Sequence, residues 1–88
     1  MKFRYDETKN ANLLATRGIG FEEIILEIKN GNLLDILEHH NQDKYPNQKI
    51  MQIRCLGKIY CVPYVKEMDG SLFLKTLYPS RKAMKKYR

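Results

Sequence analysis

The sequence predicts an α+β domain, in which a short N-terminal strand and a helical hairpin pack on an antiparallel sheet of about four strands and a basic C-terminal helix follows. Three observations predict this class. Apolar residues recur at helical spacing early in the chain, strand-forming residues alternate with turn signals later, and a cationic run follows a proline near the end. A chain of 88 residues supports one hydrophobic core, so residues 1–88 are expected to form a single domain.

The first helix is predicted over residues 7–17, after a short strand at residues 2–5. Asp6 is typical of a helix N-cap, because its carboxylate accepts from the free amides of the first turn, and Gly18 is typical of a left-handed stop. The apolar stripe of this helix is thin and consists of Ala11, Leu14 and Ala15.

The second helix has the clearest pattern in the chain. Phe21, Ile24, Ile25 and Ile28 fall at positions i, i+3, i+4 and i+7, so they line one face, and Gly31 is a natural stop. This apolar face needs a surface to bury it, and one side of the predicted sheet provides that surface.

Four strands are expected after Gly31, at residues 33–38, 50–56, 59–65 and 71–78. A polar loop spans residues 39–48, and Gly57-Lys58 and Asp69-Gly70 are turn signals. Short turns between consecutive strands produce an antiparallel meander. Pro79 then begins the final helix, where a missing amide hydrogen costs nothing.

Cysteine content and hydropathy indicate a cytoplasmic protein. Cys55 and Cys61 are too few for a disulfide framework or a metal site. No apolar run approaches the roughly 20 residues of a membrane span, and no apolar stretch follows the N-terminal cations as in a secretory signal. His39 and His40 are adjacent, so on an extended strand end they point to opposite sides and cannot share one ion. We expect no metal, no cofactor and no membrane partner.

The net charge of +6 is concentrated at the C-terminal end. Residues 1–69 hold ten Lys or Arg and all ten acids, so that part is neutral. The segment after Asp69 has six cations and no acid: Lys75, Arg81, Lys82, Lys85, Lys86 and Arg88. This asymmetry suits an anionic partner. Alternatively, the same cations stabilise the last turn of a helix through its dipole, at about 0.3–1 kcal/mol each.

The cations and hydroxyls of the predicted sheet suit metal-free RNA cleavage. In that reaction the 2′-hydroxyl of RNA attacks the neighbouring phosphate, so the protein supplies proton transfer and stabilises the added negative charge. Arg binds phosphate oxygens in pairs, and a Lys serves as base when neighbouring cations lower its pKa. The candidate groups are Lys49, Arg54, Tyr60, Tyr64, Lys75, Ser80, Arg81 and Tyr87.

Strand register decides which of these groups meet. With a two-residue turn at Gly57-Lys58, Arg54 opposes Cys61, and Cys55 and Cys61 point to opposite faces. With a two-residue turn at Asp69-Gly70, Lys75 opposes Tyr64 on the face away from Arg54. A mid-strand proline marks an edge or a bulge, and a bulge at Pro63 would invert the later side chains. The grouping of Arg54 with Lys75 therefore stays open.

The C-terminal helix has one apolar strip and two cationic rows. The strip is Ala83, Met84 and Tyr87, and the rows are Arg81 with Lys85 and Arg88, and Lys82 with Lys86. Arg81 is in the first turn, nearest the sheet, so it is the cation best placed to be held rigidly for phosphate. The other cations either hold RNA or keep the helix soluble.

Two motifs resemble the BrnT family of toxins from bacterial type II toxin–antitoxin systems. The N-terminal match consists of Phe3, Tyr5, Asp6, Lys9, Leu13, Gly18, Ile19, Phe21, Glu22 and Glu23. The C-terminal match is Pro79-Ser80-Arg81-Lys82-Ala83, followed by Lys85, Lys86 and Tyr87. The two motifs are separated by the expected distance, so the resemblance covers nearly the whole chain.

The resemblance implies a RelE-like fold, a metal-independent endoribonuclease that inhibits translation, and a BrnA-like ribbon-helix-helix antitoxin as partner, with DNA reached only through that antitoxin. The resemblance points to Arg81 and Lys82 as functional residues, and it points to Lys49 by its position in the chain. Pro79-Ser80 departs from the family's Ser-Ala. In addition, Lys75 is the only cation of the last predicted strand.

Together, residues and resemblance suggest Arg81, Lys49, Arg54 and Lys75 as catalytic groups, and Lys82, Lys85, Lys86 and Tyr64 as RNA-binding groups. The alternatives are a non-catalytic nucleic-acid-binding module and a protein-interaction module acting with a partner protein.

Overall fold

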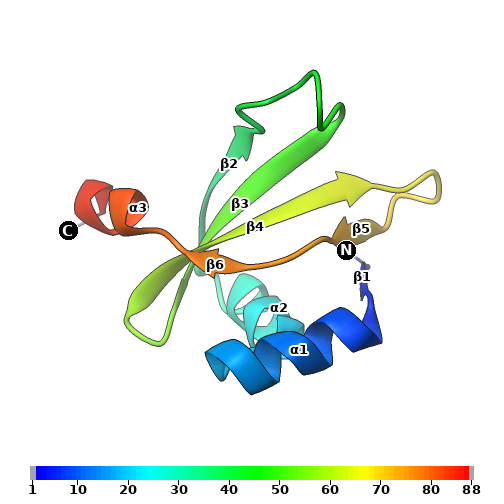
Figure 1. Ribbon diagram of the computed structural model, residues 1–88. Helices are drawn as coiled ribbons and strands as arrows, with labels where there is room; N and C mark the ends of the chain where they lie inside the picture. The colour runs from blue at the N-terminus through cyan, green and yellow to red at the C-terminus, as the bar shows by residue number, and fades with distance from the viewer. Residues whose placement is uncertain (1, 88) are drawn as a thin grey trace.

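The three helices lie on two sides of one twisted sheet in the computed structural model, which describes residues 2–87 (Figure 1). The helices α1 and α2 cover one face, and α3 lies against the other. In chain order the elements are β1 (Phe3–Tyr5), α1 (Glu7–Arg17), α2 (Phe21–Lys29), β2 (Leu33–Glu38), β3 (Gln48–Cys55), β4 (Lys58–Lys66), β5 (Leu72–Leu74), β6 (Tyr78–Pro79) and α3 (Arg81–Lys86). The predicted α+β class is confirmed.

Within residues 2–87, the sheet has six strands in the order β1-β5-β4-β3-β2, with β6 also paired to β4. The strands β2 to β5 form the predicted antiparallel meander. Two short strands extend it, since β1 pairs with β5 in parallel and β6 pairs with β4 in antiparallel orientation. No helix within residues 2–87 is long and apolar enough to cross a bilayer.

The first helix has the predicted bounds but a different buried face. Lys9 N donates to the Asp6 carboxylate at 2.9 Å, and Gly18 has a φ of 72°, as a cap and a left-handed stop require. However, Leu14 is 45 % exposed, and the buried residues are Asn10 and Leu13. The side chain of Asn10 accepts from Phe21 N at 2.8 Å. This hydrogen bond holds the Asn10 side of α1 against the start of α2, so the buried face includes a polar residue.

The second helix buries the predicted face against the sheet. Phe21 and Ile24 are fully buried, and Ile25 and Ile28 pack at the margin of the core. The Phe21 ring also stacks on Tyr5 of β1 with centroids 5.0 Å apart. We call the side of the sheet that packs against α1 and α2 the helical face, and the opposite side the α3 face.

The hairpin between β3 and β4 turns one residue earlier than predicted. Cys55 pairs with Lys58, so the turn residues are Leu56 and Gly57, with φ of 51° and 73°. A two-residue hairpin turn with positive φ at both positions matches the twist of its strands. The pairing moves by two residues, so Arg54 opposes Ile59 instead of Cys61, but the predicted faces are unchanged. Cys55 and Cys61 are both buried and free, and they point to opposite faces.

The hairpin between β4 and β5 has a three-residue loop instead of the predicted two-residue turn. Glu67 N donates to Ser71 O at 2.7 Å, and Gly70 adopts a φ of 88°. Leu74 therefore opposes Tyr64, and the prediction that Lys75 opposes it was wrong. One residue of register inverts every later side chain, so Lys75 lies on the α3 face.

A bulge at Pro63 divides the predicted strand 71–78 into β5 and β6. Lys75 N donates to Pro63 O at 2.8 Å, but proline has no amide hydrogen to return. Residues 75–77 then oppose only two residues of β4, since Leu74 pairs with Tyr64 and Tyr78 pairs with Cys61. Because β6 takes up Pro79, α3 begins at Arg81 and not at Pro79 as predicted.

Candidate nucleic-acid interface

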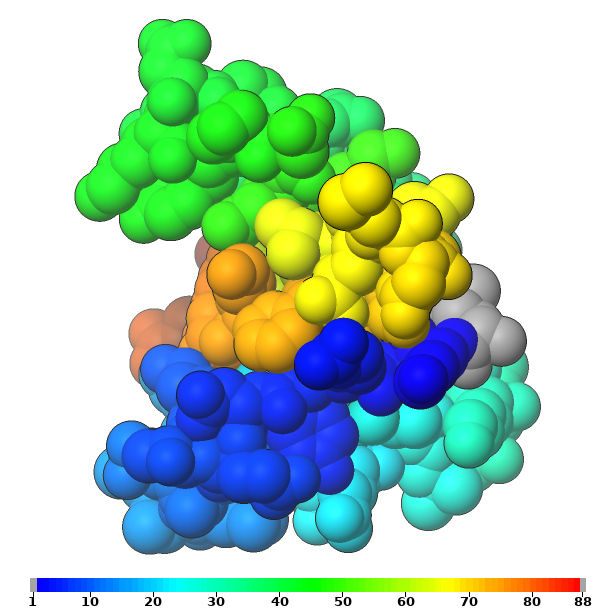
Figure 2. All heavy atoms as spheres, turned by 90° about the vertical axis from the view of Figure 1, so that its right-hand side faces the viewer, coloured from blue at the N-terminus to red at the C-terminus, as the bar shows by residue number. Residues whose placement is uncertain are grey.

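A recess lies on the α3 face between the loop at residues 39–47 and the segment that follows β5. Figure 2 shows the loop (green) overhanging that segment (orange). The recess has a volume of ≈ 520 Å³, within the about 300–1,000 Å³ typical of small-ligand sites. It is lined by His39, His40, Tyr45, Gln48, Pro63, Lys75, Thr76 and Tyr78.

Three aromatic rings stack on the loop side of the recess. The rings of His39 and His40 have centroids 4.6 Å apart and planes inclined by 25°. Tyr45 lies against His39 at 4.5 Å, and the Lys44 ammonium lies 5.3 Å from the centre of the Tyr45 ring. No residue of the loop is buried, so this cluster forms at the surface and not in the core.

Hydrogen bonds hold the loop in this shape. His39 N donates to Gln48 O at 3.2 Å, which continues the ladder between β2 and β3, and the chain bends at His40. Asn41 N donates to His39 Nδ1 at 3.1 Å, and Tyr45 N donates to Asn41 O at 2.9 Å. Since Nδ1 of His39 accepts a hydrogen bond, the neutral ring has its proton on Nε2.

The opposite wall has a cation and hydroxyl groups. The Lys75 ammonium is 5.1 Å from the centre of the Phe73 ring, and the side chain of Lys75 is exposed. Burial raises the pKa of the Tyr78 phenol, and the neighbouring Cys61 raises this pKa further. Tyr78 is therefore protonated at neutral pH, so its hydroxyl is able to donate a hydrogen bond.

A second hollow lies beneath α3, further along the same face. It is lined by Leu37, Gln52, Ser80, Lys82, Ala83 and Lys86. Ser80 caps α3 by accepting from Ala83 N at 3.1 Å, and Tyr87 Oη donates to Gln52 Oε1 at 3.3 Å. Gln48 and Gln52 are four residues apart on β3, so the two hollows lie about 13 Å apart.

The predicted cations divide among three regions. Lys75 lines the recess, and Lys82 and Lys86 line the second hollow, where Lys86 also pairs with Asp35 at 3.6 Å. Arg81 and Lys85 are exposed on α3, one turn apart, but line neither hollow. The predicted two-row pattern of α3 agrees with this division for residues 81–86, and Arg88 lies outside the described residues.

Arg54 shares a face with Lys75 but is not its neighbour. Arg54 opposes Ile59, and Lys75 contacts Pro63, so about 13 Å along β4 separates them. Arg54 instead lines a hollow at the far end of α3 with Met84 and Tyr87.

Lys49 and Tyr64 lie on the helical face, away from both hollows. They oppose each other on β3 and β4, and Lys49 pairs with Glu38 at 3.9 Å. Tyr64 is 7 % exposed and belongs to the core cluster, and with Lys49 it lines a separate hollow of ≈ 410 Å³ on the helical face. Burial raises the pKa of the Tyr64 phenol, and Glu38 adds to that shift. The structure therefore does not bring Lys49, Arg54, Lys75 and Arg81 together.

Sequence reasoning missed the aromatic side of the recess. Adjacent histidines diverge on a strand, but β2 ends at Glu38 and the chain bends at His40. Both rings consequently face one recess. The available signal was the composition of residues 39–47, where two histidines and a tyrosine occur among turn-forming residues.

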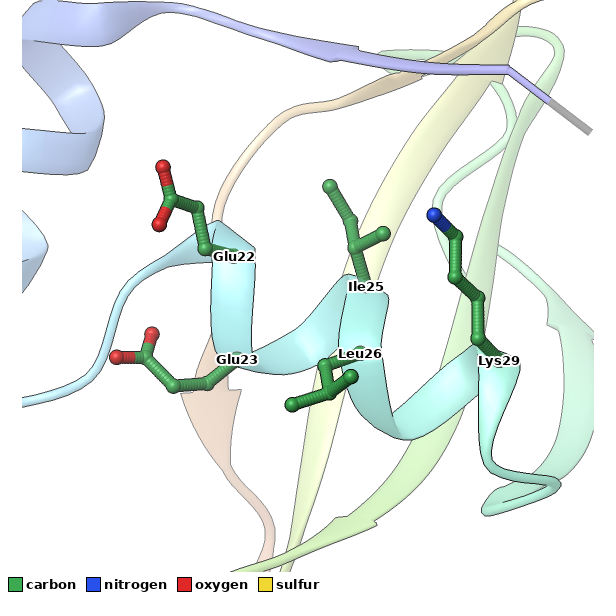
Figure 3. A pocket seen from close by; sticks show the side chains of 5 residues that line it. All are labelled: Glu22, Glu23, Ile25, Leu26 and Lys29. Carbon is green, nitrogen blue, oxygen red and sulfur yellow. The ribbon is translucent and has the colours of Figure 1, made fainter.

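Another hollow lies on the outer side of α2 and does not suit phosphate. Figure 3 shows Glu22, Ile25 and Lys29 extending from one side of this helix and Glu23 and Leu26 from the other. The Glu23 carboxylate already accepts from Gly20 N at 2.9 Å, and Leu26 is 57 % exposed. Two carboxylates against one ammonium repel an anion, so the α3 face is the better candidate for nucleic acid.

Comparison with known protein families, curated proteins and solved structures gave no match. Among residues 2–87, no three His, Cys, Asp or Glu side chains cluster closely enough to hold a metal ion.

Proposed function

We propose that this protein is an RNA-cleaving enzyme whose active site is the recess under the 39–47 loop. The observation that carries the proposal is the meeting of two imidazoles with Lys75 and Tyr78 in one recess, next to a helix rich in cations. These groups can supply every function that cleavage by the RNA 2′-hydroxyl needs, without a metal ion.

The proposed reaction begins when one imidazole of the pair accepts the proton of a 2′-hydroxyl. Histidine suits this step because it exchanges protons near neutral pH. The 2′-oxygen bonds to phosphorus, the bond from phosphorus to the 5′-oxygen breaks, and the leaving oxygen takes a proton from the second imidazole or from Tyr78. Lys75 stabilises the negative charge that builds on the phosphate. The products are a 2′,3′-cyclic phosphate and a 5′-hydroxyl.

We also propose that the protein is a BrnT-like toxin that inhibits translation and is neutralised by a ribbon-helix-helix antitoxin. The resemblance at both ends of the chain supports this role. In the N-terminal motif, Asp6 caps α1 and Glu23 caps α2, so this motif bears on folding. In the C-terminal motif, Ser80 caps α3 and Arg81 and Lys82 are exposed, so this motif bears on the surface that meets RNA or the antitoxin.

The second candidate function is a nucleic-acid-binding module without catalysis. The observation that favours it is the position of Arg81 and Lys85, which are exposed but line neither hollow. Cations in such positions add affinity for phosphate without touching a reacting group.

Cleavage of RNA in excess chelator tests the proposal. We expect the purified protein to cut RNA and leave the stated ends, and His39→Ala combined with His40→Ala to slow cleavage by about 10²–10⁴-fold. The matched control is Lys9→Ala, which removes an exposed cation of α1 on the far side of the sheet. Intact RNA with folded wild-type protein would refute catalysis, and binding that weakens steeply with salt would then select the second function.

A further inference from the structure

The loop at residues 39–47 presents a stacked aromatic surface that has no role in the core. His39 and Tyr45 are partly exposed and His40 is exposed, while the contacts of 4.5 and 4.6 Å between their rings hold them together. Hydrogen bonds to His39 and Asn41 fix the backbone beneath them. Because these contacts and hydrogen bonds already hold the rings in place, another flat ring can stack on the cluster without first ordering it.

The groups around the cluster suit a nucleotide. A nucleobase is a flat ring with polar edges, and stacking on aromatic side chains does not depend on its identity. The half-buried amide of Gln48, at the floor of the recess, can donate to and accept from a base edge. Lys75 on the opposite wall provides the positive charge for the adjoining phosphate.

Only an unpaired base can enter such a recess. In an RNA duplex each base is stacked on both sides, and the deep major groove excludes side chains. The overhang of the loop above the segment after β5 also leaves a recess and not an open platform for a helix (Figure 2). A recess of this kind therefore suits an unpaired base better than a duplex.

We infer that the recess selects single-stranded RNA by stacking one nucleobase on the cluster of His39, His40 and Tyr45, with its phosphate beside Lys75. This inference rests on the proposed function for the identity of the ligand as RNA. It adds the class of RNA and the side chains that recognise it. Tyr45 is the residue that tests it, because the cleavage chemistry does not use Tyr45.

Equilibrium binding in excess chelator compares a labelled 12-nucleotide RNA with the same strand in a duplex. We expect wild-type protein to prefer the single strand. Tyr45→Ala weakens single-strand binding by about 5- to 140-fold, the range for loss of one stacked base. Tyr45→Phe keeps the ring and the affinity, and Tyr45→Leu, which has bulk but no aromatic face, loses affinity as Tyr45→Ala does. Thermal unfolding should show that each variant is folded, because the loop has no buried residues.

Two outcomes would overturn the inference. The first is equal affinity for single-stranded and duplex RNA, and the second is unchanged single-strand affinity in folded Tyr45→Ala; either one leaves the cleavage proposal standing. If cleavage is absent while Tyr45-dependent binding persists, the catalytic proposal fails and the inference holds. If neither form of RNA binds, both fail.

Discussion

His39 and His40 stack ring against ring with centroids 4.6 Å apart, although they are consecutive in the sequence. Consecutive side chains on a strand point to opposite faces. Here β2 ends at Glu38, and the bend at His40 turns both imidazoles toward the recess that Lys75 enters from the other side. The shape of the proposed site therefore depends on where a strand ends and on a loop that folds over the sheet.

The position of each cation predicts its effect on RNA binding. Lys75→Ala should weaken binding to single-stranded RNA and reduce the slope of log K against log salt by about 0.7, the value for one phosphate contact. Lys49→Ala, on the opposite face and paired with Glu38, should change neither quantity. Titrations at four or more salt concentrations measure both. Equal losses for the two variants would contradict the assignment of the α3 face.

Ser80 is predicted to act as a helix cap and not as a catalytic group. Ser80→Ala removes the acceptor for Ala83 N and should lower the free energy of unfolding by about 1 kcal/mol. Ser80→Asn provides another cap acceptor without adding a negative charge beside Lys82 and Lys86, so stability and RNA affinity should both match the wild type. Urea unfolding and RNA binding of the three proteins check this. A loss of cleavage in the stable Ser80→Asn protein, with its binding intact, would show instead that the hydroxyl takes part in chemistry.

Asn10 and Gly20 are expected to be coupled in stability. A Cβ at Gly20 would lie 2.5 Å from Asn10 Oδ1, so Gly20→Ala should destabilise the fold by about 1–3 kcal/mol. Asn10→Ala leaves the buried amide of Phe21 without its acceptor and should cost about 1–3 kcal/mol. In the double variant the contact with Asn10 is removed and only the looser contacts with Leu14 at 3.1 Å remain, so the combined loss should be smaller than the sum of the single losses. Additive losses would contradict this contact.

Stability should fall at alkaline pH. Burial raises the pKa of Cys55 above its ordinary value of 9.0, and Glu27 and Glu23 add to the shift. Burial also raises the pKa of the Tyr64 phenol and that of the Tyr78 phenol above their ordinary value of 10.0. The unfolded chain therefore loses these protons first, so the free energy of unfolding decreases as pH rises through 9.0 and then 10.0.

Urea unfolding between pH 7 and 10.5 measures this decrease. The step near pH 9.0 should be smaller in Cys55→Ala than in the wild type, whatever the variant's stability at pH 7. An identical pH profile for the two proteins would rule out a contribution from Cys55.

Local patterns predicted the helices and the strand faces. The spacing of Phe21, Ile24, Ile25 and Ile28 identified the buried face of α2, and alternation placed Met51 and Tyr60 on the helical face even though the turn began one residue early. These predictions succeeded because they depend on a period of 3.6 or 2 residues and not on which strand residues pair.

Other features depend on tertiary contacts, which the periodicity of the sequence does not reveal. The buried face of α1 includes Asn10, because its hydrogen bond to Phe21 N lies across the hairpin. The position of Lys75 depended on a three-residue loop where two residues were predicted, since an Asp-Gly pair fits either length. The charge distribution in the sequence identified the cationic segment after Asp69, but only the fold shows that Lys75 and the 39–47 loop share a recess.

The most direct test of the proposed RNA site is a titration of ¹⁵N-labelled protein with single-stranded RNA in excess chelator, followed by amide chemical shifts. Shifts should concentrate in residues 39–48 and 75–86, and the amides of α1 and α2 should stay unchanged. Shifts centred on the outer side of α2 or around Lys49, or none at RNA concentrations that saturate binding, would contradict the site proposed on the α3 face.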